Sequence, residues 1–165
     1  MAPRHPNGRD LTVDLRARAE LEDLLSRFSD AISCVDRARF LELWAADGEW
    51  SVPGMSPARG REAIGRQFDD VFTVFPQVVQ LVSYGVLEPA GDGVVHGRRH
   101  MSEFATNVDG RTSQFVGFYD DEIVRTDQRW RFRRRTFHMR YRIWLDEGGK
   151  RFPISDTYRG PLREA

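Results

Sequence analysis

The chain has a single cysteine, no net charge and no long hydrophobic run. Cys34 alone cannot form an intramolecular disulfide, and its apolar neighbours favour a small buried side chain in a helix, as suits a reducing compartment. Twenty-five basic residues balance twenty-five acidic ones, so no net field draws the molecule to nucleic acid or to an anionic membrane. No eighteen apolar residues run together, and the N-terminus lacks the apolar stretch of a signal peptide. We therefore expect a cytoplasmic protein with no nucleic-acid partner and no membrane partner.

The motifs of cofactor chemistry are also missing. The sequence has no Gly-rich phosphate loop, no nucleophile elbow and no dinucleotide fingerprint. His96 and His100 lie too far apart along a strand for a tight metal pair, and no helical His-x-x-x-His motif or cysteine ligand accompanies them. We therefore expect no metal and no cofactor.

What is present fits one globular domain: 165 residues, 40% of them hydrophobic and 30% charged. Residues 1–10 are rich in proline and charge and predict a flexible tail. Residues 11–146 form the expected domain, and residues 147–165 are a loop-like C-terminal extension, a candidate cover for a pocket. Helical patterns precede strand patterns, an order that predicts an α+β fold.

Three segments have helical spacing. The first begins at Leu15 and carries one apolar stripe over about 20 residues. A second, shorter helix is predicted from Phe40, Leu43 and Trp44, ending at Gly48 in a left-handed cap. A short strand over 49–52 follows, and then a third helix over 64–75, which ends before a proline.

Four strand-period runs follow, over residues 78–88, 94–107, 112–126 and 130–145, with the turn signals GDG, VDG and TDQ between them. The last run is rich in arginine. A nucleic-acid patch is one interpretation, but the arginines alternate with aromatic residues, which favours a strand with one solvated face. Four long antiparallel strands curl readily, and a curved sheet wrapped around helices leaves a pocket on its concave face.

A resemblance to a known family rests on four segments: AISCVDRARFLELWAADGEW, ARGREAIGRQF, LEPAGDG and GFYDDEIVRTDQRWRFRRR. They resemble the SnoaL-like branch of the nuclear transport factor 2-like superfamily, which includes polyketide cyclases, scytalone dehydratase and ketosteroid isomerase. The resemblance implies a cone-shaped curved antiparallel sheet around three N-terminal helices, with a small hydrophobic substrate or ligand inside. It also implies a homodimer formed through the outer face of the sheet, where Val116, Phe118 and Val124 would make an apolar stripe.

The resemblance also implies an acid–base pair. The acid of the family's dehydratases matches Asp36, while Gln80 stands where the family often has its histidine. On the next strand, His96, Arg98, His100 and Ser102 share one face by the two-residue period. The imidazole of His100, facing Asp36 across the cone, would restore the pair, because histidine titrates near neutrality. The alternatives are a helix-capping role for Asp36 and a histidine simply held by a neighbour at position 100.

Other residues are candidates for ligand binding. Trp50, Tyr84, Phe115 and Tyr119 suit an aromatic lining, although core packing explains each equally well. Arg98 and Arg135 suit an anionic or enolate oxygen, and solvated or ion-paired arginines are the alternative. Gln80 and His138 complete the expected substrate-binding set.

Two functions of different class remain open. The first is a cofactor-independent acid–base enzyme, a dehydratase, cyclase or isomerase, acting on a hydrophobic oxygenated ring compound such as a polyketide or steroid, with Asp36 and His100 as the catalytic pair. The second is a non-catalytic small-molecule binder or structural subunit of the same fold, which the replacement of the family histidine by Gln80 favours.

Overall fold

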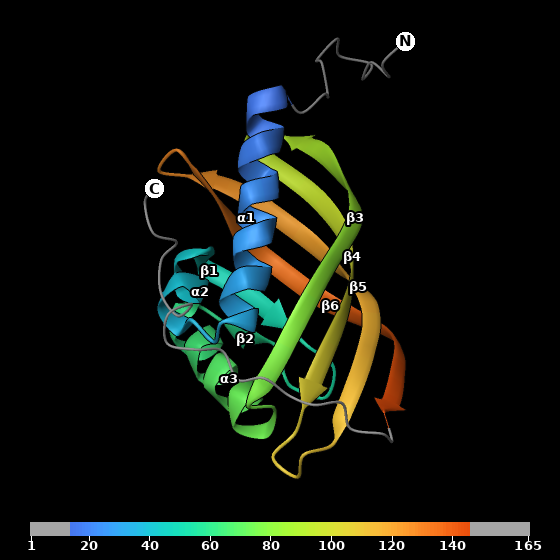
Figure 1. Ribbon diagram of the computed structural model, residues 1–165. Coiled ribbons are helices and arrows are strands. Elements are labelled where there is room, and N and C mark those ends of the chain that lie inside the picture. The colour runs from blue at the N-terminus through green and yellow to red at the C-terminus, as the bar shows by residue number, and fades with distance from the viewer. Residues whose placement is uncertain (1–13, 146–165) are drawn as a thin grey trace, which may run out of the picture.

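The computed structural model describes residues 14–145 (Figure 1). The expected tail over residues 1–10 and the expected extension over residues 147–165 lie outside the described residues. The fold class is α+β as predicted, and within these residues it consists of three helices and one curved, unclosed sheet of six strands.

The helices begin and end where local chemistry allows. Helix α1 spans Leu15–Ser33, and the carboxylate of Asp14 caps it by accepting from the backbone N–H of Ala17 at 2.8 Å. Helix α2 spans Arg37–Glu42 and helix α3 spans Arg61–Val74. Cys34 is the C-cap of α1 and is half-buried rather than buried as predicted. Within the described chain, none of these helices is both long and apolar enough to span a bilayer.

The strands are β1 (Trp44–Ser51), β2 (Ala58–Arg59), β3 (Gln77–Gly91), β4 (Val94–Thr106), β5 (Thr112–Thr126) and β6 (Arg129–Leu145). Their order in the sheet is β2-β1-β6-β5-β4-β3, with β1 parallel to β6 and all other neighbours antiparallel. The four long strands are confirmed within a few residues of their predicted bounds. Positive φ angles at Asp92 and Gly93 and at Asp127 and Gln128 show that the GDG and TDQ signals form tight turns.

The second helix is shorter than predicted, and Trp44 belongs to a strand. Helix α2 ends at Glu42, and Trp44 pairs with Phe132 at the start of the parallel β1–β6 ladder. Gly48 lies inside β1 and makes no helix cap. The helical spacing of these residues was overridden because sheet pairing buries Trp44 completely, with an exposed fraction of 0%.

An aromatic cluster joins the helices to the sheet. Helix α1 crosses the concave side of the sheet, and α2 and α3 pack near the C-terminal half of α1 (Figure 1). Phe28 of α1 lies 5.2 Å from Phe40 of α2 and 5.6 Å from Phe132 of β6, measured between ring centroids. Trp44 and Trp50 complete the cluster, and all five side chains are at most 2% exposed. This packing fixes which face of each long strand points inward.

The contribution of α1 to the stability of the core can be measured by replacing leucine with alanine at a buried site and at an exposed site of this helix. Leu21→Ala removes a side chain that is 0% exposed, and we expect the free energy of unfolding to fall by about 2–5 kcal/mol because a cavity replaces packed atoms. Leu15→Ala is the matched control on the same helix, where the side chain is 87% exposed, and its effect should stay within about 0.5 kcal/mol. Equal losses in urea denaturation would show that α1 does not pack as described.

Candidate functional site

Side chains of β4 alternate between the two faces of the sheet with the predicted two-residue period. The histidines, however, lie on the outer face and not on the concave face where they were expected. Val95, Met101 and Ala105 are buried on the concave face, at most 3% exposed. His100 has the other parity and therefore lies on the outer face, together with His96 and Arg98. The reason is packing, because Val95, Met101 and Ala105 belong to the same buried core as the apolar stripe of α1.

Outside the cone, four side chains from neighbouring strands stack into a ladder. Tyr84 stacks on His100 at 4.5 Å, His100 lies 5.6 Å from Phe118, and Phe118 stacks on His138 at 5.0 Å, all between ring centroids. His138 Nε2 lies 3.4 Å from a carboxylate oxygen of Asp120. Arg98 also pairs with Asp120, at 3.1 Å. The expectation that Tyr84, Arg98, His100 and His138 face an interior ligand is therefore not met.

Asp36 lies at the N-terminus of α2, where it caps the helix. One carboxylate oxygen accepts from the backbone N–H of Arg39 at 3.0 Å, and the other accepts from the guanidinium of Arg39 at 2.7 Å. Partial burial works to raise the pKa of Asp36, but the hydrogen bonds from Arg39 outweigh it and leave that pKa below its ordinary value. Asp36 and His100 thus lie in different environments and do not form the expected pair across the cone.

Inside the cone, Gln80 is the centre of a hydrogen-bonded chain. Its amide oxygen accepts from the hydroxyl of Ser29 on α1 at 2.8 Å, and its amide nitrogen donates to Glu103 Oε2 on β4 at 2.9 Å. The backbone N–H of Gln80 donates to Ser33 Oγ at 3.0 Å. Gln80 is only 7% exposed, and its role in substrate binding stays a prediction.

Arg135 carries a positive charge into the aromatic core. Its guanidinium lies 4.0 Å from the ring centroid of Tyr119 and 4.1 Å from that of Phe28. Arg135 Nη1 lies 3.3 Å from Asp121 Oδ2, and both side chains are at most 2% exposed. The hydroxyl of Tyr119 interacts with both Gln80 and Arg135, so the ion pair and the Gln80 chain form one buried cluster. We call Ser29, Gln80, Glu103, Tyr119, Asp121 and Arg135 the interior polar cluster.

Burial controls the protonation of this cluster. It raises the pKa of Asp121 to about 6, although the charge of Arg135 works in the opposite direction. Burial also lowers the pKa of Arg135, and it raises those of Glu103 and Tyr119. Both oxygens of Asp121 and two nitrogens of Arg135, Nε and Nη1, make no hydrogen bond within residues 14–145. The cluster thus holds polar atoms able to bind a ligand.

Trp50 and Phe115 also face inward, as expected. Trp50 belongs to the core, and its backbone carbonyl accepts from Gln67 at 3.3 Å. Phe115 packs edge-on against Phe75, with ring centroids 6.0 Å apart. Farther along the concave face, Trp144 is 49% exposed. The inner face therefore reaches solvent at this wide end of the cone.

Three members of the interior polar cluster were missed from the sequence: Ser29, Glu103 and Asp121. The alternation of side chains along the strands would have identified the two acids, because Glu103 lies two positions from the buried Met101 and Asp121 lies two positions from the buried Tyr119. Ser29 lies one position after Phe28 on α1, on the buried side of the helix. Only the packing of α1 shows which parity is the inner one.

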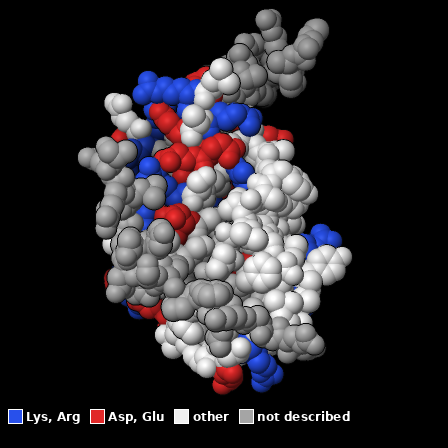
Figure 2. Space-filling model, in the orientation of Figure 1, with Lys and Arg blue, Asp and Glu red and all other residues white. Residues whose placement is uncertain are grey.

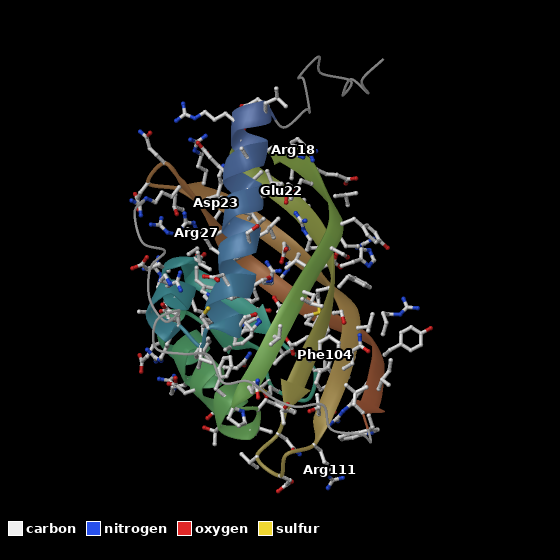
Figure 3. The ribbon with its side chains drawn as sticks, viewed as in Figure 1. Arg18, Glu22, Asp23, Arg27, Phe104 and Arg111 are labelled. Carbon is white, nitrogen blue, oxygen red and sulfur yellow. The ribbon has the colours of Figure 1, made fainter. Side chains whose placement is uncertain are left out.

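A second concavity lies outside the cone, between α1, the end of α2 and the β5–β6 turn. This groove has a volume of about 480 Å³, and charged side chains of both signs line it, together with Leu24, Leu43 and Trp130. Asp23 and Arg27 lie on this side of α1 in Figure 3, whereas Glu22 lies on the β3 side, where it pairs with Arg99. Charged side chains are dense around the N-terminal half of α1 in Figure 2. Across residues 14–145, no group of three or more His, Cys, Asp or Glu side chains is placed to hold a metal ion.

The architecture defines the class of the protein: an unclosed curved sheet folded over N-terminal helices is the nuclear transport factor 2-like cone. Within that class the chain belongs to the family of the SnoaL-like domain, whose model matches residues 13–136. The family resemblance inferred from the sequence is thereby confirmed.

Individual relatives are more distant. Gamma-hexachlorocyclohexane dehydrochlorinase of Sphingobium indicum is 27% identical over 128 residues, which cover 73% of this chain and 79% of that protein. A crystal structure of hexachlorocyclohexane dehydrochlorinase LinA-type3 from Novosphingobium barchaimii superposes with a TM-score of 0.77 at 22% identity, covering 85% of this chain and 97% of that one. A protein of Nostoc punctiforme with a cystatin-like fold superposes with a TM-score of 0.67 at 16% identity, covering 80% of this chain and 96% of that one. These superpositions show a shared fold.

The buried carboxyl of Asp121 predicts a specific dependence of stability on pH. Its pKa rises from 3.8 to about 6 on burial, so this group stabilises the fold fully below pH 3.8 and loses that contribution as the pH rises through about 6. The Asp121→Asn variant lacks this titration. We therefore expect the unfolding free energy of the wild type, minus that of the variant, to fall between about pH 4 and pH 7 in urea denaturation.

The exposed Asp47→Asn variant is the matched control, and it should not reproduce this fall. A difference for Asp121→Asn that rises with pH would show that the attraction of Arg135 outweighs burial.

Proposed function

We propose that this protein is a cofactor-independent acid–base enzyme of the dehydratase, cyclase or isomerase type. Its substrate would be a small hydrophobic, oxygenated ring compound such as a polyketide or a steroid. The observation that carries the proposal is the interior polar cluster: a guanidinium, a phenol and two carboxyl groups lie on the concave face within an aromatic core. Titratable groups with burial-shifted pKa values, gathered on one face, are typical of an active site.

The cluster supplies both kinds of group that such a reaction needs. A carboxylate accepts a proton from carbon, which typically contributes about 10²- to 10⁴-fold in rate. Fixed N–H and O–H donors from Arg135 and Tyr119 stabilise the negative charge that develops on an oxygen or on a departing group. In a region with little water these donors act strongly, because few competing dipoles surround them.

The surroundings of the cluster favour an apolar substrate. Three aromatic rings, those of Phe28, Tyr119 and Phe132, have their centroids 4.0–4.5 Å from the guanidinium carbon of Arg135. Toward the wide end, the concave face continues through Phe115 to Trp144. The curated relatives are named as dehydrochlorinases, a lyase-type activity that agrees with acid–base chemistry in this fold.

A non-catalytic binder or structural subunit is the second candidate. The observation that favours it is the pairing of Asp121 with Arg135, which neutralises one carboxylate, together with the presence of Gln80 at the position matched to the family histidine. A binder would keep its ligand unchanged. Ligand binding and turnover therefore distinguish the two candidates.

The test is a screen of polycyclic ketones, phenols and steroids, with thermal shift for binding and chromatography for turnover. We expect the wild type to consume at least one compound that raises its melting temperature. Tyr119→Phe should lower kcat by about 10²- to 10³-fold, because one donor to the developing charge is lost. Tyr141→Phe is the matched control, since Tyr141 is 66% exposed on the same sheet.

The two candidates predict different results in this screen. A compound that binds and stays unchanged would support the binder. Equal activity of both tyrosine variants would remove Tyr119 from the mechanism.

We also propose a homodimer formed through the outer face of the sheet. Val116 and Phe118 lie on that face, as the resemblance implied, but Val124 is buried, with 8% exposed, and does not extend the stripe. Leu81 is 53% and Val86 56% exposed on the same face. The surface over β3 is largely free of charge in Figure 2. Apolar surface of this kind gains free energy when a second surface covers it.

Sedimentation velocity tests the homodimer. The wild type should sediment as a dimer, and Leu81→Arg should shift it to the monomer because a charge would be buried in the interface. Val108→Arg is the control, since Val108 is 68% exposed in the β4–β5 turn, away from the proposed interface. A wild-type monomer, or a dimer that persists in Leu81→Arg, contradicts the proposed interface.

A further inference from the structure

The two carboxyl groups of the interior polar cluster have different surroundings. Asp121 lies 3.3 Å from the guanidinium of Arg135, so its negative charge is paired. Glu103 forms no ion pair within residues 14–145, and its one side-chain hydrogen bond comes from the neutral amide of Gln80 at 2.9 Å. The charge of Arg135 opposes proton uptake by Asp121, whereas no cation opposes proton uptake by Glu103.

The position of Glu103 leaves one of its oxygens open. Gln80 and Glu103 are directly opposite in the β3–β4 register, and the amide of Gln80 donates to Oε2. No residue among 14–145 donates a side-chain hydrogen bond to Oε1, and the side chain of Glu103 is half-buried, unlike that of Asp121, which is fully enclosed. Glu103 also pairs in register with Phe115 on β5, whose ring packs edge-on against Phe75.

A second hydrogen bond fixes the orientation of the amide of Gln80. Its oxygen accepts from Ser29 Oγ at 2.8 Å, which leaves the NH₂ group directed at Glu103. The carboxylate plane is thus held by a neutral donor that cannot take its proton. Burial raises the pKa of Glu103 above its ordinary value, the direction that favours a general base acting near neutral pH.

We propose that Glu103 is the general base of the interior site, positioned by Gln80 and Ser29, and that its substrate carries an acidic C–H bond. This inference rests on the proposed function. Such a bond lies next to a carbonyl group, or next to a carbon that bears a leaving group.

The proton transfer balances without a co-reactant. In an elimination, the C–H bond breaks, its proton goes to Oε1 of Glu103, and its electron pair forms the new C=C bond. The leaving group departs from the neighbouring carbon with its bonding pair, as an anion that the N–H and O–H donors of Arg135 and Tyr119 stabilise. Glu103 then releases the proton to water. In an isomerisation the electron pair forms an enolate, and the same proton returns from Glu103 to a different carbon.

The deciding variant is Glu103→Gln, which keeps the size and one hydrogen-bonding oxygen but accepts no proton. We expect kcat on any compound turned over by the wild type to fall at least about 10²-fold, with circular dichroism and melting temperature retained. Activity of the wild type should also be lost as the pH falls through the pKa of Glu103, because the protonated carboxyl is no base. Glu88→Gln is the matched control, since Glu88 is exposed on β3.

A second variant keeps the test decisive if Glu103→Gln folds poorly. Glu103→Asp retains a carboxylate on a shorter side chain, and it should keep part of the activity together with the acidic limb of the pH profile. Ser29→Ala should lower kcat less than Glu103→Gln and shift that limb, because it frees the amide of Gln80 to rotate.

Two outcomes overturn the proposal in distinguishable ways. Wild-type kcat and an unchanged pH profile in Glu103→Gln would remove Glu103 from the reaction while the proposed function stands. No turnover of any compound by the wild type itself would overturn the proposed function and this inference with it.

Discussion

A positive charge lies inside the cone, and the arrangement of the interior follows from the need to stabilise it. Removing a guanidinium from water costs several kcal/mol unless other groups replace the lost hydration. Here Asp121 provides a countercharge at 3.3 Å, and the faces of Phe28 and Tyr119 provide cation–π contacts at about 4 Å. Arg135, itself on β6, therefore makes stabilising contacts with both α1 and β5. Without any one of these contacts, the charge would be buried with too little compensation.

The polar groups around Arg135 form a continuous path across the sheet. From Asp121 the path leads through Arg135 to Tyr119 and then through Gln80 to Glu103. Each of the four long strands contributes at least one member, and α1 adds Ser29 at the side. At one end of the path the carboxyl is paired with a cation, and at the other it is not. This asymmetry gives two otherwise similar acids different chemistry.

Much of the fold was predictable because it depends on local periodicity. The four long strands, their turns and the first and third helices follow from residue spacing, and each depends on neighbours close in sequence. Trp44 was misassigned because its strand is paired with β6, a partner nearly ninety residues away. No local pattern contains that contact.

The site was less predictable, for a different reason. The two-residue period correctly placed His100 with Arg98 and His96, but the period cannot say which face of a strand points inward. That choice depends on the buried core, which Val95 and Met101 share with the apolar stripe of α1, so the histidines of opposite parity lie on the outer face. On β6 an irregularity in the register with β5 puts both Phe132 and Arg135 on the inner face, three positions apart, which a strict alternation forbids.

The irregular course of β3 has a consequence for self-association. Among residues 14–145 no strand lies beyond β3, so this edge exposes backbone groups that could pair with a strand of another molecule. Three features oppose such growth. The hydroxyl of Ser33 already accepts a hydrogen bond from the backbone N–H of Gln80. The pairing register with β4 is interrupted between Val82 and Gly85, and Pro89 has no backbone N–H that could donate to another strand. The hydrogen bond from Gln80 of β3 to Ser33 of α1 thus holds Gln80 in the interior and also opposes pairing of this edge with another molecule.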